Sequence, residues 1–198
     1  YMLHRARKLG LSARVLEAGA GVGGTWYWNR YPGARCDVES MEYSYQFDEA
    51  LQQEWRWSER YAAQPEILRY LNHVADRFDL RKDIRFETRV VAAAYDESSA
   101  RWTVRASDGA ETSAQFLVMA TGCLSSANVP HIKGLESFAG ARYHTGQWPH
   151  EEVDFAGKRV GVIGTGSTAV QITGALVPRV ARFSLFQRTA QWIAPQEN

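Results

Sequence analysis

Apolar residues recur at helical spacing in two stretches of the chain. Over residues 1–9 they follow a period of three to four, which predicts a helix that stops at Gly10. Pro65 opens a longer amphipathic stretch with polar residues on its opposite face. The apolar face of this second helix consists of Ile67, Leu68, Leu71, Val74, Ala75 and Phe78. We interpret that face as core rather than as a partner surface.

Short apolar runs predict strands on either side of these helices. Residues 13–16 form a strand that ends at Glu17, and the glycine-rich stretch 19–24 follows. We interpret this part as the second half of a strand–helix–strand unit. From residue 26 to residue 57 the chain is rich in Tyr, Trp and Pro, which predicts a long ordered loop with short pieces of helix. Long ordered loops of this kind are usually functional.

Three further runs predict a small antiparallel sheet. The Asp108-Gly109 pair is a turn signal between the last two of them. We expect the last run to continue into a buried strand at 116–119. The three runs are residues 84–95, 102–106 and 112–120.

The C-terminal part of the chain carries a second strand–helix–strand pattern, and this one is intact. Residues 158–163 predict a strand, a glycine turn follows, a helix extends to about residue 177, and residues 182–187 predict another strand. Glycines in such a turn let the backbone approach a pyrophosphate, and the helix N-terminus supplies amide donors. The turn has the spacing G-x-G-x-x-A and consists of Gly164, Thr165, Gly166, Ser167, Thr168 and Ala169.

The residue that ends the second strand of such a unit lies beside the adenosine ribose and reports which nucleotide binds. In the first unit this residue is Glu17, whose carboxylate can accept both ribose hydroxyls and would repel a 2′-phosphate. In the second it is Arg188, followed by Thr189, and both can pair with a 2′-phosphate. The first unit therefore suits FAD or NAD, and the second suits NADPH.

These elements predict an α/β fold with two Rossmann-like dinucleotide-binding domains, the first for FAD or NAD and the second for NADPH, and a small antiparallel sheet in the first. We expect a partial first domain at 1–137 that lacks its first strand and glycine turn, a linker at 138–152, and the start of the NADPH domain at 153–198. The chain begins with Tyr1 inside a predicted helix, and no predicted element closes its end. We therefore expect both domains to be incomplete pieces of a longer protein.

Composition removes several classes of function. Twenty-three Lys and Arg stand against 22 Asp and Glu, so the net charge of +1 gives no general attraction for nucleic acid or an anionic membrane. The longest apolar runs are far shorter than a membrane span, and there is no signal peptide. Neither the two cysteines nor the five histidines show a metal-ligand spacing. We expect a cytoplasmic protein without a metal site; oligomeric state stays open.

Two long motifs resemble the Baeyer–Villiger monooxygenases, the FAD- and NADPH-dependent flavoproteins that include phenylacetone, cyclohexanone and steroid monooxygenases. Residues 23–37 read GGTWYWNRYPGARCD and fill every fixed position of G-G-x-W-x-x-x-x-Y-P-G-x-x-x-D. A second fingerprint, F-x-G-x-x-x-H-x-x-x-W-P, precedes the glycine turn of the second unit. Its fixed positions are filled by Phe138, Gly140, His144, Trp148 and Pro149.

The resemblance implies roles for individual residues. FAD contacts would come from Glu17, Gly24, Thr25, Trp26, Asp37 and Tyr43, with Val90 or Val91 near the adenine. Arg35, Cys36 and Asp37 would lie where the nicotinamide meets the flavin, while residues 164–169, Arg188 and Thr189 hold the rest of NADPH. In the family the counterpart of Asp37 supports an active-site arginine, so Asp37 is the one catalytic candidate here, and that arginine would lie beyond Asn198.

Three residues of these motifs have structural interpretations that we prefer. We expect His144 to hydrogen-bond a linker rather than to act as a base, and Trp148 to be a packing residue. Cys36 has no partner base that would mark it as a nucleophile, so we interpret it as a packing residue whose backbone touches a cofactor.

The activity that the resemblance implies is conversion of a ketone to an ester or lactone, using NADPH and O2 through an FAD peroxide. The closest alternative is a flavin monooxygenase that oxidises nitrogen or sulfur, against which Trp148-Pro149 argues. A pyridine-nucleotide reductase is disfavoured because a redox-active C-x-x-C is absent from the sequence. A third reading is a noncatalytic fragment that binds NADPH at best.

Overall fold

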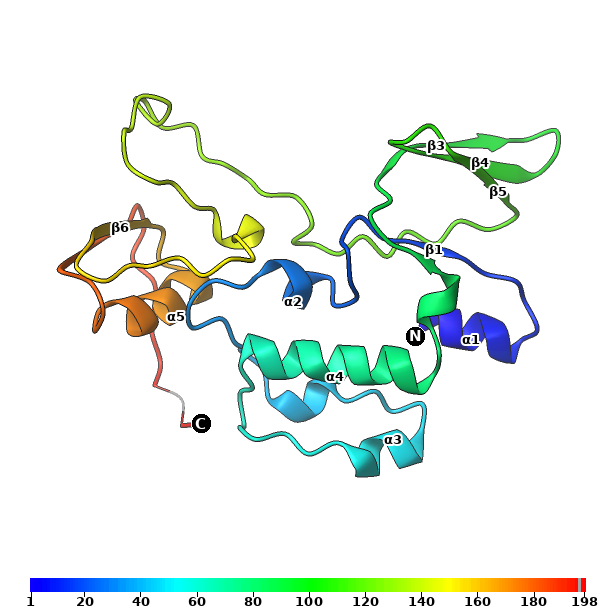
Figure 1. Ribbon diagram of the computed structural model, residues 1–198, viewed down its shortest axis with the longest axis horizontal. Helices are drawn as coiled ribbons and strands as arrows, with labels where there is room; N and C mark the ends of the chain where they lie inside the picture. The colour runs from blue at the N-terminus through cyan, green and yellow to red at the C-terminus, as the bar shows by residue number, and fades with distance from the viewer. Residues whose placement is uncertain (196) are drawn as a thin grey trace.

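The computed structural model describes residues 1–195 and 197–198, and it has an α/β fold with short helices and small sheets (Figure 1). Its α-helices are α1 (Met2–Lys8), α2 (Thr25–Trp28), α3 (Glu49–Glu54), α4 (Gln64–Arg77) and α5 (Ser167–Leu176). Single turns of 3-10 helix are η1 (Ser40–Tyr43), η2 (Arg81–Asp83) and η3 (Thr145–Gln147). The strands are β1 (Val15–Leu16), β2 (Ile84–Arg85), β3 (Val90–Asp96), β4 (Arg101–Ala106), β5 (Glu111–Ala114), β6 (Arg159–Ile163) and β7 (Arg182–Phe186).

Helix α4 lies at the centre of the molecule (Figure 1). Pro65 occupies its first turn, where the missing amide costs nothing, as the sequence predicts. Ile67 and Tyr70 are almost completely buried, and they belong to two neighbouring clusters that pack the long loop onto the helix. The apolar face is therefore core, and the expected loop with short helices is confirmed by α2, η1 and α3.

The first parallel pair of strands is shorter than predicted. Only Val15 and Leu16 of the run 13–16 are paired, and their partners are Ile84 and Arg85 of β2. The expectation of one strand over 84–95 is wrong, because Glu87 has a φ of 52°, which turns the chain between β2 and β3. Strand β2 extends the parallel pair, whereas β3 starts a different sheet.

The predicted antiparallel sheet is present, with strand order β3-β4-β5. Val104 and Ala106 of β4 are its buried residues. The predicted strand at 112–120 ends at Ala114, and the expected buried strand at 116–119 is wrong. Phe116 is 74% exposed and Met119 is 78% exposed. A strand needs a neighbour to satisfy its amides and carbonyls, and in the described part of the chain none pairs with this run.

The second unit matches its prediction closely. Strands β6 and β7 pair in parallel, with α5 as the crossover between them. This is one strand–helix–strand unit of the Rossmann type. Ala169, Ile172 and Leu176 form the buried face of α5.

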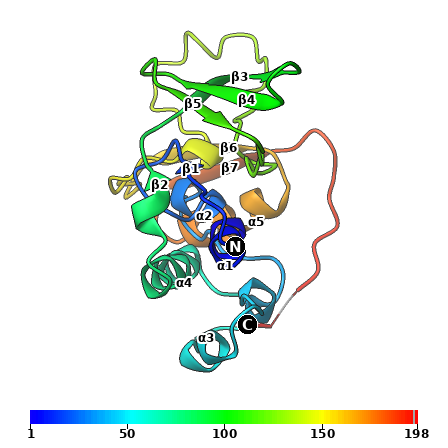
Figure 2. The same ribbon diagram turned by 90° about the vertical axis from the view of Figure 1, so that its right-hand side faces the viewer.

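The two ends of the molecule are joined by more than one segment of chain. Figure 1 places the β3–β5 sheet at one end and the β6–α5 unit at the other, with α2 and α4 between them. Figure 2 shows α1, α2 and α4 below that sheet, with α3 farthest from it. A hydrophobic cluster fastens the second unit to the loop at α2: it contains Tyr31, Ala34, Trp148, Phe155, Ile172 and Leu176.

Candidate functional site

Residues 23–37, which we call the motif loop, begin against the central helix. Gly23 has a φ of 131°, and a Cβ at this position would lie 2.6 Å from Cδ1 of Leu68 on α4. Gln64, at the start of α4, donates a hydrogen bond from Nε2 to the carbonyl oxygen of Trp26. Gly23 therefore allows the start of α2 to approach α4 closely.

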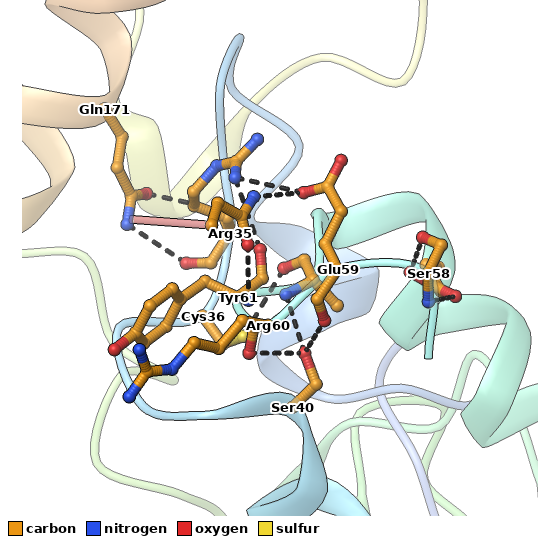
Figure 3. A network of polar contacts seen from close by, with 11 residues as sticks. Arg35, Cys36, Ser40, Ser58, Glu59, Arg60, Tyr61 and Gln171 are labelled. Carbon is orange, nitrogen blue, oxygen red and sulfur yellow. Dashed lines mark hydrogen bonds and ion pairs between the residues drawn. The ribbon is translucent and has the colours of Figure 1, made fainter. Parts of the chain in front are cut away.

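The end of the motif loop is joined to residues 59–64 by backbone and hydroxyl contacts. The Cys36 amide donates to the carbonyl of Ala62 over 3.1 Å, and Gln64 N donates to Ala34 O over 2.8 Å. Ser40, which is buried, accepts from the Ala62 amide through Oγ at 2.8 Å. The same hydroxyl reaches the carbonyl oxygen of Glu59. Figure 3 shows Cys36, Ser40 and Glu59 within this network.

Trp26, Cys36 and Tyr43, which the sequence assigns to cofactor contact, lie in one cluster. The rings of Trp26 and Tyr43 meet edge to face, with centroids 5.6 Å apart. Burial raises the pKa of the Cys36 thiol, and its Sγ lies 3.4 Å from the Ala62 carbonyl oxygen. Burial also raises the pKa of the Tyr43 hydroxyl. Cys36 is thus packed in the core, and its raised pKa favours the thiol over the thiolate.

Arg35 and Asp37 flank Cys36 and point to more open surroundings. The Arg35 guanidinium forms an ion pair with Glu59 at 3.1 Å and donates to the Tyr61 carbonyl at 3.3 Å. Asp37 is exposed, and within the described residues its carboxylate has neither an ion pair nor a hydrogen bond. Asp37 is therefore free to contact a group that enters from outside.

Glu17 is positioned by the backbone on both sides. Its amide donates to Arg85 O over 2.9 Å, and its carbonyl accepts from Thr88 N over 2.8 Å. One carboxylate oxygen, Oε1, accepts from the Gly19 amide at 2.7 Å. The following glycine-rich stretch packs on the ring of Tyr27, which would come within 2.9 Å of a Cβ on Gly19.

The glycine turn of the second unit, residues 164–169, is open at its surface. Gly164 has a φ of 115°, and a Cβ on Gly164 or Gly166 would meet nothing within 4 Å. Gly166 is the N-cap of α5 and supplies no side chain to the free amides of the first turn. The Thr165 hydroxyl donates to Thr189 O at 3.2 Å, which ties the turn to the end of β7. The turn has the form that accepts an anion.

Arg188 and Thr189 come two and three residues after the end of β7, and the Thr189 carbonyl contacts the turn. The Arg188 side chain is exposed, and it has no ion pair with any residue in the described ranges. An unpaired guanidinium in the segment that contacts an open helix N-terminus adds local positive charge, although the whole chain carries a net charge of only +1.

The motif loop and the second unit meet at Gln171 of α5 (Figure 3). The Tyr31 hydroxyl donates to Gln171 Oε1 at 2.8 Å, and the Gln171 amide group donates from Nε2 to Arg35 O at 3.0 Å. Gly33 has a φ of 81° and lies so close to α5 that an added Cβ would be 2.5 Å from the Gln171 carbonyl oxygen. The Y-P-G part of the motif is therefore a close contact with α5.

The fingerprint residues have structural contacts. The Phe138 ring covers Gly140, where a Cβ would lie 2.6 Å from it. His144 accepts a hydrogen bond at Nδ1 from the Gly146 amide at 3.1 Å and so caps η3, as the linker interpretation expects. Trp148 is only 7% exposed and packs in the cluster that joins the two units. Its role as a packing residue is confirmed.

Val90 and Val91 do not join the rest of the predicted site. They lie at the start of β3, at an irregularity in the pairing with β4, and both are exposed. Neither valine belongs to the described cluster that contains Trp26 and Tyr43. Their assignment to the adenine of FAD stays a prediction.

Three residues important to the site were not predicted: Gln171, Tyr27 and Ser40. Gln171 lies between Val170 and Ile172 in the predicted helix, and a polar residue in that context predicts an ordinary exposed position. Tyr27 and Ser40 occupy positions within or just after the motif that its pattern leaves free. The one available signal was a polar residue beside the buried face of an apolar helix.

Two further features are absent from the described residues. No group of three or more His, Cys, Asp or Glu side chains is arranged to hold a metal ion. No helix there is long and apolar enough to cross a membrane.

Comparison with known proteins identifies the family. The model of the family "Flavin-binding monooxygenase-like" matches residues 40–197. An acetone monooxygenase (methyl acetate-forming) of Gordonia sp. (strain TY-5) is 48% identical over 198 residues, which are 100% of this chain and 37% of the relative. A phenazine N-monooxygenase of Lysobacter antibioticus is 47% identical over 98% of this chain and 36% of its own length.

A solved structure agrees with these sequences. Oxidised steroid monooxygenase bound to NADP has 59% sequence identity and a TM-score of 0.92 over 98% of this chain and 37% of that one. The chain belongs to the flavin-binding monooxygenase-like family, and Baeyer–Villiger monooxygenases are among its similar relatives. It spans a little over a third of the length of these relatives. The family resemblance drawn from the two motifs is thereby confirmed.

Proposed function

We propose that this chain is part of an FAD- and NADPH-dependent Baeyer–Villiger monooxygenase that converts a ketone to an ester or lactone with O2. The observation that carries the proposal is that two features lie in one structure and in contact. One is the open glycine turn with the unpaired Arg188 after it, and the other is the complete motif loop. The family match and the acetone monooxygenase relative support it.

The residues of the first unit fit a flavin dinucleotide. Glu17 has one carboxylate oxygen held by Gly19, so the other can accept a ribose hydroxyl. Trp26 and Tyr43 offer aromatic surface, and Gly24 and Thr25 begin α2 nearby. Asp37 is exposed beside them. We assign these residues to FAD, with Val90 or Val91 at the adenine.

The residues of the second unit fit NADPH. Amides at the start of α5 can donate to the pyrophosphate, and Gly164 and Gly166 leave room for its approach. Arg188 and Thr189 can bind the 2′-phosphate through charge-assisted hydrogen bonds. Arg35 and the adjacent Cys36 are assigned to the junction of nicotinamide and flavin, because Gln171 ties the Arg35 backbone to α5.

When bound, the two cofactors supply hydride transfer and activation of O2. The residues of this chain bind them, orient them and exclude water. Trp26 and Tyr43 present apolar surface at the assigned flavin site. Asp37 supplies a negative charge that can hold a basic side chain in place, which is its assigned catalytic role. The Arg35 guanidinium adds positive charge two residues away, held by Glu59.

We also propose the corresponding domain division. Residues 1–137 belong to the FAD-binding domain, 153–198 to the NADPH-binding domain, and 138–152 link them. Both domains would be Rossmann-like and would extend beyond this chain. Support comes from the separate parallel pairs β1–β2 and β6–β7. The capped turn η3 and buried Trp148 lie between the two domains.

The test is nucleotide selectivity of Arg188→Ala in the FAD-loaded full-length protein. Loss of charge-assisted hydrogen bonds to a phosphate should weaken NADPH binding roughly ten- to a hundredfold, with NADH binding unchanged. Titration calorimetry measures both affinities. Arg182→Ala, at the opposite end of β7, is the matched control and should bind both nucleotides like the wild type. Equal loss for both nucleotides would contradict the assignment of Arg188.

The reaction itself is tested by product analysis. The full-length protein, with FAD, NADPH and O2, should convert at least one member of a panel of linear and cyclic ketones to an ester or lactone, detected by gas chromatography. Consumption of NADPH without any such product, across the panel, would reject ketone oxygenation.

Oxygenation of nitrogen is the second candidate, because the phenazine N-monooxygenase is nearly as similar to this chain as the acetone monooxygenase. The argument from Trp148-Pro149 against this reaction stays a prediction. Adding a heteroaromatic amine to the same panel separates them, since an N-oxide without ester or lactone would favour this candidate.

A further inference from the structure

Gln171 makes three hydrogen bonds to the motif loop from one side chain. Its Oε1 accepts from the Tyr31 hydroxyl at 2.8 Å and from the Arg35 amide at 3.3 Å. Its Nε2 donates to the Arg35 carbonyl at 3.0 Å. The side-chain amide thus pairs with both backbone groups of Arg35, as a neighbouring strand would. An amide meets this pattern because it carries a donor and an acceptor.

Gln171 lies about one turn after Ser167, the first residue of α5, and two residues after the glycine turn. The helix is rigid over this distance, so a contact made by Gln171 also fixes the amides at its start. The Tyr31 hydroxyl adds a second connection, since it lies 3.4 Å from Oγ1 of Thr168 inside the turn. Two points of the second unit are therefore joined to the motif loop.

The packing around these hydrogen bonds allows little adjustment. Gly33 touches the Gln171 backbone, and Ala34 and Ile172 belong to the same buried cluster. Burial raises the pKa of the Tyr31 hydroxyl, which therefore stays protonated as a donor. In a partly buried place, a donor or acceptor group that loses its hydrogen-bond partner is not freely satisfied by water instead.

We propose that Gln171 is a positioning residue that sets the distance between the nucleotide-binding turn on α5 and Arg35–Asp37, and thereby the reach of the nicotinamide to the flavin. The inference rests on the proposed function. In hydride transfer the C–H bond of the reduced nicotinamide breaks, and its hydrogen and two electrons pass to the flavin, leaving NADP⁺. A proton from solvent completes the reduced flavin. This step depends steeply on the distance between the two rings, whereas nucleotide binding depends on the phosphate contacts.

The experiment compares Gln171→Met with the wild type in the FAD-loaded full-length protein. Methionine keeps the length of the side chain and removes all three hydrogen bonds. Anaerobic stopped-flow absorbance should show flavin reduction at saturating NADPH slowed roughly ten- to a hundredfold. NADPH affinity, measured by titration calorimetry, should stay close to that of the wild type. Amide exchange of residues 33–36, read without nucleotide, should become faster.

The matched control is Thr173→Val, which removes a hydrogen bond from Thr173 Oγ1 to Ala169 O within α5 and touches no residue of the motif loop through it. It should leave the reduction rate and the exchange of residues 33–36 unchanged. Tyr31→Phe supplies a milder test, should Gln171→Met fold poorly. It removes one of the three hydrogen bonds and keeps the ring in its cluster, so a smaller decrease of the reduction rate is expected.

Each outcome decides between the claims. If the wild type shows no flavin reduction by NADPH, the proposed function is wrong and the inference falls with it. If the wild type is reduced and both Gln171→Met and Tyr31→Phe match its rate, the inference alone is overturned. If nucleotide affinity falls in step with the reduction rate, Gln171 acts on binding and not on the reach of the nicotinamide.

Discussion

The motif loop and the connection at residues 115–137 are both irregular, and both carry large apolar side chains. In the motif loop, Tyr31 and Cys36 are buried against α5 and α4, and Gly33 touches α5 directly. In the connection, Phe116, Val118 and Met119 are more than half exposed. Figure 1 shows the connection crossing between the two ends of the molecule.

The two regions differ in whether their backbone amides and carbonyls find hydrogen-bond partners, and not in the hydrophobicity of their side chains. The end of the motif loop and the three residues after it, together residues 34–40, are matched by residues 59–64, whose backbone forms hydrogen bonds with them. The connection has only local turns, such as the hydrogen bond from Leu135 N to Ile132 O. Apolar side chains become buried where the backbone beside them also finds partners.

The largest effect is expected from a side chain placed at Gly33. Gly33→Val forces a β-branched residue to a φ of 81° and drives its Cβ toward the Gln171 carbonyl oxygen. Together these should lower the free energy of unfolding by about 3 kcal/mol or more, measured in urea. Gly122→Val, in the connection, has a φ of 78° and no atom within 4 Å, so it isolates the cost of the conformation. Equal losses for both variants would show that the contact with α5 contributes nothing.

An intermediate effect is expected from Ser40→Ala, which leaves the buried amide of Ala62 without its acceptor. The free energy of unfolding should fall by about 1–3 kcal/mol. The local signature is Cys36, whose burial holds its pKa above the ordinary thiol range, so it stays a protonated thiol, unreactive at neutral pH. A thiol reagent should modify exposed Cys123 first and reach Cys36 faster in the variant than in the wild type.

The control for Ser40→Ala comes from the other region. Ser125 also uses its hydroxyl to contact a backbone carbonyl, that of Gly122, but the contact is exposed. Ser125→Ala should therefore change neither the stability nor the modification rate of Cys36. An unchanged Cys36 rate in Ser40→Ala would mean that the two paired segments do not depend on this hydroxyl.

The smallest effect is expected in the connection itself. Met119 is 78% exposed, so Met119→Ser in the 198-residue chain should change the free energy of unfolding by less than about 0.5 kcal/mol. Chemical denaturation detects changes above this level. A loss of more than about 1 kcal/mol would show that another surface covers Met119 and that the contrast between the two regions is smaller than the structure indicates.

The parts of the fold that were predictable depend on local signals. Helix α4 has an apolar period and a proline at its start, and β6, α5 and β7 follow one another with a glycine turn between. The runs at 84–95 and 116–119 failed for a different reason. Pairing decides whether an apolar run is a strand, and the positive φ of Glu87 has no sequence signal, because glutamate rarely adopts it.

The residues of the candidate site also divide into those that local sequence signals predict and those that they do not. Glu17, Arg188 and the glycine turn were predictable because their places follow from the geometry of a strand–helix–strand unit. Gln171 was not, because its importance comes from Arg35 and Tyr31, which are about 140 residues away in sequence. Single-sequence patterns record spacing along one element and carry no information about which loop that element will meet.

The contact between Gly33 and α5 also constrains mechanics. Since no gap separates the Gly33 backbone from the carbonyl oxygen of Gln171, the loop cannot slide along the helix without parting from it. A displacement of α5 therefore moves the backbone of Arg35 with it. Any flexibility between the two ends of the molecule therefore has to lie elsewhere, and the exposed connection at residues 115–137, with its local hydrogen bonds, is a segment that can supply it.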